Sequence, residues 1–120
     1  MNNIKFEFDR GTTYSRDFTI EGYNHDINAI YFTVKENEND KRSVLCKKLN
    51  NGITLVDEVN DSKTYNLLIK CVDTNDLKVN KEYYFDVRVV SYLPTGDIRK
   101  TLFKGTMTLG ANITQPCNEI

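Results

Sequence analysis

The residues best suited to acid–base chemistry in this sequence are one histidine and its neighbour. His25 is the only histidine among 120 residues, and it adjoins Asp26 in the stretch NHDIN. A histidine oriented by a carboxylate could act as a general base. Neighbouring residues rarely face each other in a turn or strand, however, and no nucleophile is tied to this pair. An exposed histidine in a turn is therefore the better interpretation.

Clusters of acidic and amide side chains in NENDK, DEVNDS and DTND could supply oxygen ligands for calcium. None has the spaced aspartates, glycine and distal glutamate of a calcium loop, so solvated turns explain them better. Asp73 and Asp76 could also form a carboxylate pair that cleaves a glycoside. We expect Asp73 instead to cap a short helical turn within VDTNDLK.

The three cysteines, Cys46, Cys71 and Cys117, are scattered and, with a single histidine, lack the paired spacing of a zinc site. The start MNNIKFEFDR has no basic segment followed by an apolar one, so no secretory signal is predicted. An odd number of cysteines without such a signal predicts reduced thiols made in a cytoplasm. We expect Cys46 and Cys71 to be small buried residues of strands, and Cys117 to belong to a tail.

Motifs that hold a nucleotide or activate a serine are absent from the sequence. It contains no G-x-G-x-x-G, no G-K-[ST] and no G-x-S-x-G, and no helical pattern follows the early RGTT. The net charge is −1, from 16 basic and 17 acidic residues, which disfavours nucleic acid and anionic membranes as partners. No apolar run approaches the roughly 20 residues that span a bilayer. We therefore predict no catalytic residues, no cofactor and no metal.

Alternation of apolar and polar residues is the dominant pattern, and it predicts antiparallel strands with one buried face. It is clear at 3–9, 17–21, 29–35, 64–71, 82–90 and 100–109, and two shorter stretches, 43–48 and 53–56, could be edge strands. The residues expected to face inward are Ile4, Phe6, Phe8, Phe18, Ile20, Ile30, Phe32, Val34, Tyr65, Leu67, Ile69, Cys71, Tyr83, Phe85, Val87, Val89, Thr101, Phe103, Met107 and Leu109. Gly105, inside the last stretch, predicts a bulge or a close backbone approach.

Turns rich in glycine, asparagine and aspartate separate these stretches. About seven to nine short strands at such spacing are typical of a β-sandwich. We predict an all-β fold, an immunoglobulin-like or fibronectin III-like antiparallel sandwich formed by residues 1–114. Residues 115–120, which lie beyond the alternation, are expected to form a C-terminal tail.

The stretch LKVNKEYYFDVRV supports the sandwich, because Leu77 and Tyr83 stand as the pair that forms a tyrosine corner. In such a corner the tyrosine hydroxyl bonds to backbone a few residues upstream and fixes the crossing between sheets. The stretch resembles the corresponding part of fibronectin type III domains, although Val79 stands where that family prefers proline. Tyr83 is then expected to point inward and Tyr84 outward.

Outward-facing aromatic residues are the remaining candidates for binding. Tyr31, Tyr84 and Tyr92 are predicted on outward faces of strands, and Arg88 lies near them. Tyrosine and arginine are enriched at protein interfaces, which favours a protein partner. A carbohydrate-binding or adhesion module with the same fold is the alternative, since the tyrosines could form a platform for sugars. The absence of tryptophan counts against that alternative.

An ordered set of motifs gives the sequence a wider resemblance, which extends from about Ile4 to Thr114. The motifs are FDRGTTYSRDFTIEG, AIYFTVKEN, GITL, NLLIKCVDTNDLKVNKEYYFDVRVV and KTLFKGTMTLGANIT. Their order resembles a family of small immunoglobulin-like virion proteins of tailed bacteriophages, and is similar to the N-terminal domain of the phage baseplate upper protein.

The resemblance implies a non-enzymatic structural role in the virion: an adaptor, a decoration subunit, or a module that attaches fibre or baseplate parts to head, neck or tail. It implies synthesis in a bacterial host cytoplasm and symmetric assembly of many copies with other virion proteins. The contacts expected are an apolar patch, paired sheet edges, the outward residues of 82–92 and the segment from Ala111. Relatives often continue into a stalk, so this chain, which stops, is expected to act as a stand-alone subunit.

Overall fold

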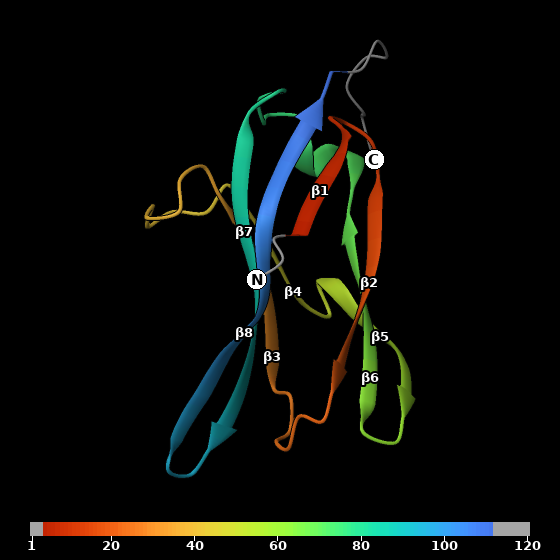
Figure 1. Cartoon of the computed structure of the whole chain (residues 1–120), viewed down its shortest axis with the longest axis vertical. Helices are drawn as coiled ribbons and strands as arrows, with labels where there is room; N and C mark the ends of the chain where they lie inside the picture. Colours follow the sequence, from red (N-terminus) through yellow and green to blue (C-terminus); the bar gives the residue numbers. More distant parts are fainter. Residues whose placement is uncertain (1–3, 112–120) are drawn as a thin grey trace.

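The alternating stretches form the strands of an all-β fold in the computed structural model, which describes residues 4–111 (Figure 1). The strands are β1 Ile4–Asp9, β2 Tyr14–Glu21, β3 Ala29–Lys35, β4 Leu45–Leu49, β5 Gly52–Val59, β6 Ser62–Ile69, β7 Glu82–Leu93 and β8 Gly96–Gly110. A short 3-10 turn, η1 (Cys71–Thr74), lies between β6 and β7. No helix among residues 4–111 is long and apolar enough to cross a membrane.

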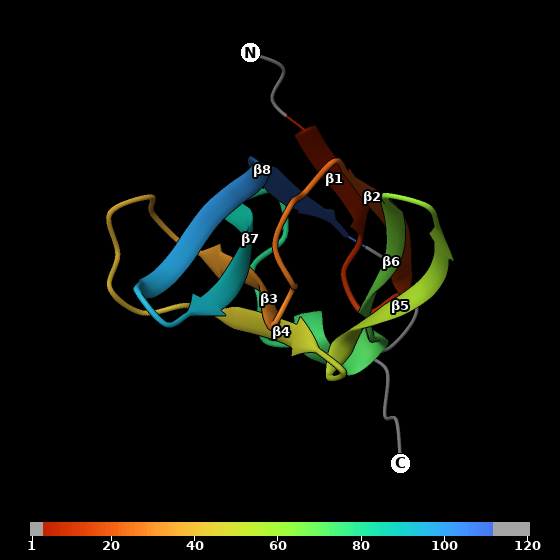
Figure 2. The same ribbon diagram turned by 90° about the horizontal axis from the view of Figure 1, so that it is seen from below.

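Hydrogen bonding joins the eight strands in the order β1-β8-β7-β3-β4-β5-β6-β2. β4 and β5 pair only through Lys48 with Gly52 and Leu49 with Ile53, and the sheet folds over here into two facing layers (Figure 2). One layer holds β1, β8, β7, β3 and β4, and the other holds β5, β6 and β2. β1 is parallel to β8 and β4 to β5, whereas the other pairs are antiparallel. The predicted immunoglobulin-like β-sandwich is confirmed.

The inner faces of the two layers form the core, as the alternation requires. Phe6, Phe32 and Phe85 lie together, with ring centroids 6.0 Å apart for Phe6 and Phe32 and 4.3 Å apart for Phe6 and Phe85. Full burial of such a side chain contributes roughly 1.5–3 kcal/mol to folding. The buried apolar residues are Phe6, Ile20, Ile30, Phe32, Val34, Ile53, Tyr65, Leu67, Ile69, Leu77, Tyr83, Phe85, Val87, Val89, Val90, Met107 and Leu109.

The bond expected of a tyrosine corner is present at the start of β7. The Tyr83 hydroxyl accepts a 2.8 Å hydrogen bond from the backbone N–H of Lys78, and the Tyr83 side chain is buried. Leu77 is buried as well, in the same core cluster. The crossover from η1 into β7 is therefore held both by packing and by a hydrogen bond, while Tyr84 faces the other way.

β8 departs from the predicted alternation at one residue. The pattern places Thr101 on the inner face, but Thr101 is exposed and pairs with Arg88 on the outer face. The register of β7 with β8 shifts just before Arg88, where Leu102 of β8 is an extra residue. Such a β-bulge reverses the side that the preceding residues face. The prediction for Thr101 is wrong because a period of two does not reveal an inserted residue.

Gly105 marks a close backbone approach, one of the two predicted possibilities. It pairs with Ile4 of β1 and with Phe85 of β7. A Cβ atom at Gly105 would overlap the carbonyl oxygen of Ile4. The missing side chain is what lets β1 lie against β8 at this point.

The pairing of β1 with β8, as far as residues 4–111 show it, divides the sandwich into two halves. In the closed half, β8 residues Gly105–Thr108 are paired with both β7 and β1, and Leu109 and Gly110 continue the pairing with β1. In the open half, β8 residues 96–104 pair, among the described residues, with β7 alone. The closed half is at the top of Figure 1 and the open half, which ends in the β7–β8 and β5–β6 hairpins, is at the bottom.

The two described cysteines differ from the expectation of buried, reduced thiols. Cys46 is free but exposed, because it pairs with Thr33 on the outer face of β4. Cys71 is partly exposed and disulfide-bonded. β6 ends at Ile69, so Cys71 begins η1 and does not extend the buried face of the strand. Cys117, the domain boundary at residue 114 and the tail at 115–120 lie outside the described residues.

Candidate functional site

The outer face of β7 brings together three of the four residues that the sequence suggested for binding. Because the odd-numbered residues from 83 to 89 are buried, Tyr84, Asp86 and Arg88 face outward. The register of β3 with β7 sets Tyr31 opposite Arg88 and Lys35 opposite Tyr84. Tyr31, Tyr84 and Arg88 therefore share one face of the sandwich.

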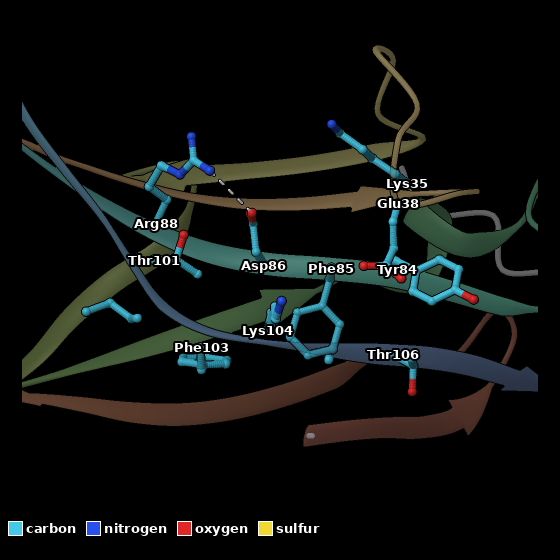
Figure 3. A pocket seen from close by; sticks show the side chains of 12 residues that line it. Lys35, Glu38, Tyr84, Phe85, Asp86, Arg88, Thr101, Phe103, Lys104 and Thr106 are labelled. Carbon is cyan, nitrogen blue, oxygen red and sulfur yellow. Dashed lines mark ion pairs between the residues drawn. The ribbon is translucent and has the colours of Figure 1, made fainter. Parts of the chain in front are cut away.

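An open groove of about 820 Å³ runs along this face, over β7, β8 and the segment that follows β3 (Figure 3). We call it the outer groove. Figure 3 shows Tyr84 and Glu38 toward one end and Arg88 and Thr101 toward the other. The lining residues are Lys35, Glu38, Tyr84, Phe85, Asp86, Arg88, Thr101, Leu102, Phe103, Lys104, Gly105 and Thr106.

Charges of both signs surround the outer groove. Arg88 Nη2 lies 3.7 Å from Asp86 Oδ2, and the two side chains are 45% and 35% exposed. Lys104 pairs with Asp86 in the register of β7 and β8. An ion pair this exposed contributes at most about 1 kcal/mol to folding. The charged groups can therefore exchange partners with little effect on stability.

Tyr31 stands beside Arg88 without lining the outer groove, and Tyr92, the fourth candidate, lies outside the groove lining and farther along β7. Tyr92 pairs with Asp97 in the β7–β8 hairpin and is 54% exposed. Four residues of extended chain place it roughly 13 Å beyond Arg88. Its backbone N–H donates a 2.8 Å hydrogen bond to Asn28 Oδ1, so the backbone at Tyr92 helps to hold the chain before β3.

The polar groups of the outer groove are suited to binding. They are charged side chains and threonine hydroxyls around the Tyr84 ring, and the lining contains no histidine or cysteine. Among residues 4–111, no three histidine, cysteine, aspartate or glutamate side chains gather where they could hold a metal ion. A tyrosine ring surrounded by hydrogen-bond donors and acceptors can pack against a partner protein and form hydrogen bonds with it.

His25 lies away from the outer groove, in the loop before β3. It is exposed, and its ring stands edge-on to the Tyr23 ring at a centroid distance of 5.8 Å. The neighbouring Asp26 accepts a hydrogen bond from the Ser91 hydroxyl through its backbone carbonyl. Within the described part of the chain, no hydrogen bond or ion pair joins the His25 ring to the Asp26 carboxylate.

Asp73 has the capping role that the sequence suggested. Its carboxylate accepts a 2.7 Å hydrogen bond from the backbone N–H of Lys70, at the start of η1. The same carboxylate lies 2.6 Å from the Lys47 ammonium, and both side chains are mostly buried. The ion pair with Lys47 ties η1 to β4, whereas Asp76 is exposed.

The structure adds groove residues that the sequence interpretation missed. Asp86 lies two residues from both Tyr84 and Arg88, so the alternation of β7 could have predicted that it faces outward with them. Lys104 becomes a neighbour of Asp86 only through the register of β8, and the bulge hides that register in the sequence. Glu38 follows β3 in an irregular segment and carries no pattern.

Comparisons with known proteins add a distant likeness of fold. No protein-family model matches the chain, and no curated protein matches it. Among solved structures, the chain is similar to the extracellular portion of mouse CD200RLa, with 10% sequence identity and a TM-score of 0.36. The match covers 92% of this chain and 56% of that one, so the chain spans little more than half of the mouse structure. A match at this TM-score carries no argument about function.

Proposed function

We propose that this chain is a non-enzymatic structural protein of a bacteriophage virion, and that it docks on another virion protein through the outer groove. The observation that carries the docking role is the grouping of Tyr31, Tyr84 and Arg88 on one outward face. Tyrosine and arginine are among the residues that most often carry the energy of an interface. The ordered motifs between residues 4 and 114, which resemble those of phage virion proteins, support the virion setting.

The charge of the outer groove favours a protein over a nucleic acid as the partner. A nucleic-acid surface needs a strongly positive field. The outer groove has three basic and two acidic side chains, so its net charge is only +1. A protein surface can offer both positive and negative groups to match this mixture. The charged lining residues are Lys35, Arg88, Lys104, Glu38 and Asp86.

Incorporation into particles of the parent phage tests the proposal. We expect Y31A/Y84A/R88A to lower the number of copies per particle at least about tenfold, because three interface side chains are truncated together. Quantitative mass spectrometry of purified particles measures the copy number. Tyr92→Ala is the matched control, since Tyr92 lies on the same strand but roughly 13 Å beyond Arg88, and it should be incorporated like the wild type.

Two results would overturn the proposal in different ways. Absence of the wild-type chain from clean particles removes the virion role. Full incorporation of the triple variant removes the outer groove as the docking surface. Thermal unfolding of each purified variant shows whether a lower copy number comes from lost stability, since Tyr31 and Tyr84 are half-buried and their truncation also removes packing.

A carbohydrate-binding module is the second candidate, favoured by the Tyr84 ring beside the hydrogen-bonding groups of Glu38, Asp86 and Lys104. It predicts saturable binding of cell-wall or capsule glycans to the isolated protein, lost in Tyr84→Ala. Calorimetric titration with such glycans distinguishes the two candidates. Saturable binding with normal incorporation of the triple variant supports the carbohydrate role.

A further inference from the structure

Two strand edges in the open half lack a partner among the described residues. The β8 free edge is Gly96–Lys104, which pairs with β7 on one side only. The β5 free edge is Thr54–Val59, which pairs with β6, while β4 reaches only Gly52 and Ile53. Such edges present unpaired backbone N–H and C=O groups that can bind another strand.

The β5 free edge is both apolar and acidic. Leu55, Val56 and Val59 are 43%, 53% and 57% exposed, and they are three of the six exposed large apolar side chains in the described part of the chain. Asp57 and Glu58 give this edge a charge of −2, because the edge has no basic residue. Glu58 approaches Lys63 of β6 only to 3.9 Å, so its charge is weakly neutralised.

The β8 free edge is basic and borders a groove whose lining includes five apolar side chains among polar ones. It carries three basic residues and one acidic residue, so its net charge is 3 − 1 = +2. Beside it, the β2–β8 groove, of about 420 Å³, separates β8 from β2. The apolar side chains in the lining are Phe18, Ile20, Ile98, Leu102 and Phe103, and the charged residues of the edge are Asp97, Arg99, Lys100 and Lys104.

We propose that the β5 free edge of one copy of this chain binds the β8 free edge of the next copy. Backbone hydrogen bonds between the two strands would extend the sheet across the contact. Leu55, Val56 and Val59 would cover the apolar lining of the β2–β8 groove. The charge of −2 on one edge meets +2 on the other, which favours this pairing and its register.

The same charges disfavour symmetric pairing of like edges. Two β8 free edges would bring +2 against +2, and two β5 free edges would bring −2 against −2. Figure 2 shows β5 and β8 on opposite sides of the molecule, so one copy can use both edges at once. A contact between two different surfaces of the same chain forms a ring if its rotation closes and a filament if it does not.

This contact between copies deepens the proposed function, since a virion protein works in many copies. The β8 free edge shares Thr101, Leu102, Phe103 and Lys104 with the outer groove, but Arg99 and Lys100 lie outside the groove lining, so changes at these two residues leave the groove residues in place. Assembly of the purified chain tests the edge contact alone. Incorporation of Y31A/Y84A/R88A into particles tests the docking role alone.

Sedimentation velocity of the purified full chain, at rising concentration and at low salt, tests the proposal with two charge-reversal variants. D57K/E58K gives both edges a positive charge, and R99E/K100E gives both edges a negative charge. We expect the wild type to form oligomers and each variant alone to associate at least about tenfold more weakly. An equimolar mixture of the two variants should associate again, because each then offers the edge that the other needs.

A third variant separates the edge effect from net charge. K41E/R42E makes the same change of charge as R99E/K100E, in the exposed segment between β3 and β4, and it should associate like the wild type. The proposal is overturned if the wild type stays monomeric at all concentrations. It is equally overturned if the reversed variants associate like the wild type, or if their mixture stays monomeric while circular dichroism shows both to be folded.

Discussion

The closed and open halves of the sandwich use the same strand, β8, in different ways. In the closed half, Phe6 is fully buried, and the Tyr14 ring lies 5.1 Å from it by centroid distance. In the open half, Phe18 and Phe103 meet edge-on at 5.6 Å, and both are only partly buried. The difference is the presence of β1, which covers the core and satisfies the backbone of β8.

The contrast suggests that stability and binding capacity are divided along β8. Residues packed and hydrogen-bonded on both sides open only with global unfolding, whereas edges with one neighbour open locally at lower free energy. An edge that is easily reached by solvent is also the one that can accept a strand from another molecule.

Phe6→Ala and Phe18→Ala compare the two halves directly. Phe6→Ala should lower the free energy of unfolding by about 3–5 kcal/mol, because it leaves a cavity beneath β1. Phe18→Ala should cost about 1–2 kcal/mol, since its side chain is already partly in water. Urea unfolding measures both. Equal losses would mean that the two halves are equally packed and that the division is wrong.

Gly105→Ala tests whether β1 closes the sandwich. The added Cβ would overlap the Ile4 carbonyl oxygen and lie 3.0 Å from Phe85 Cζ, so β1 must move. We expect a loss of up to about 3 kcal/mol and faster hydrogen exchange at the β1 amides. Gly22→Ala, at φ +64° with nothing within 4 Å, is the control; it should cost about 1 kcal/mol and leave β1 protected. Protected β1 amides in Gly105→Ala would contradict the role of Gly105.

Tyr83→Phe tests the corner that leads into the closed half. Removing the hydroxyl leaves the Lys78 N–H without its acceptor, so we expect a loss of about 1 kcal/mol in the free energy of unfolding. Tyr84→Phe removes a hydroxyl on the outer face and should change stability by less than about 0.5 kcal/mol. Chemical denaturation of the two variants measures the free energy of unfolding of each. Equal losses would show that the hydrogen bond of Tyr83 does not contribute to stability.

The smallest effect, at alkaline pH, concerns Tyr65 of β6. Burial raises the pKa of Tyr65 above its ordinary value of 10.0, and the charge of Glu58 raises it further. The unfolded chain therefore loses this proton first, so stability is full below pH about 10 and falls as pH rises toward the folded pKa. Tyr65→Phe should show a smaller decrease in stability than the wild type above pH about 10. Parallel curves in denaturant titrations at several alkaline pH values would contradict this assignment.

Much of the fold was predictable because period-two patterning is local. In β3, in β6 and in β7 as far as Val89, each buried residue is two positions from the next, so the inner faces follow from the sequence. The pair Leu77 and Tyr83 likewise predicted the corner. The alternation along β7 also placed Tyr84 and Arg88 on the outer face, and these are two of the four residues that the sequence suggested for binding. Register between strands was not predictable in the same way, since it depends on partners far along the chain.

The amino-acid sequence by itself therefore determined the fold class, the inner and outer faces of most strands, and the corner. These depend on neighbouring residues, whose alternation and turn chemistry act over a few positions. The tertiary structure alone decided that Glu38 and Lys104 reach the outer groove and that Thr101 turns outward at the bulge. It also decided that β1, within the described residues, lies along Gly105–Gly110 of β8, because strand pairing joins residues about a hundred positions apart and no local pattern records its extent.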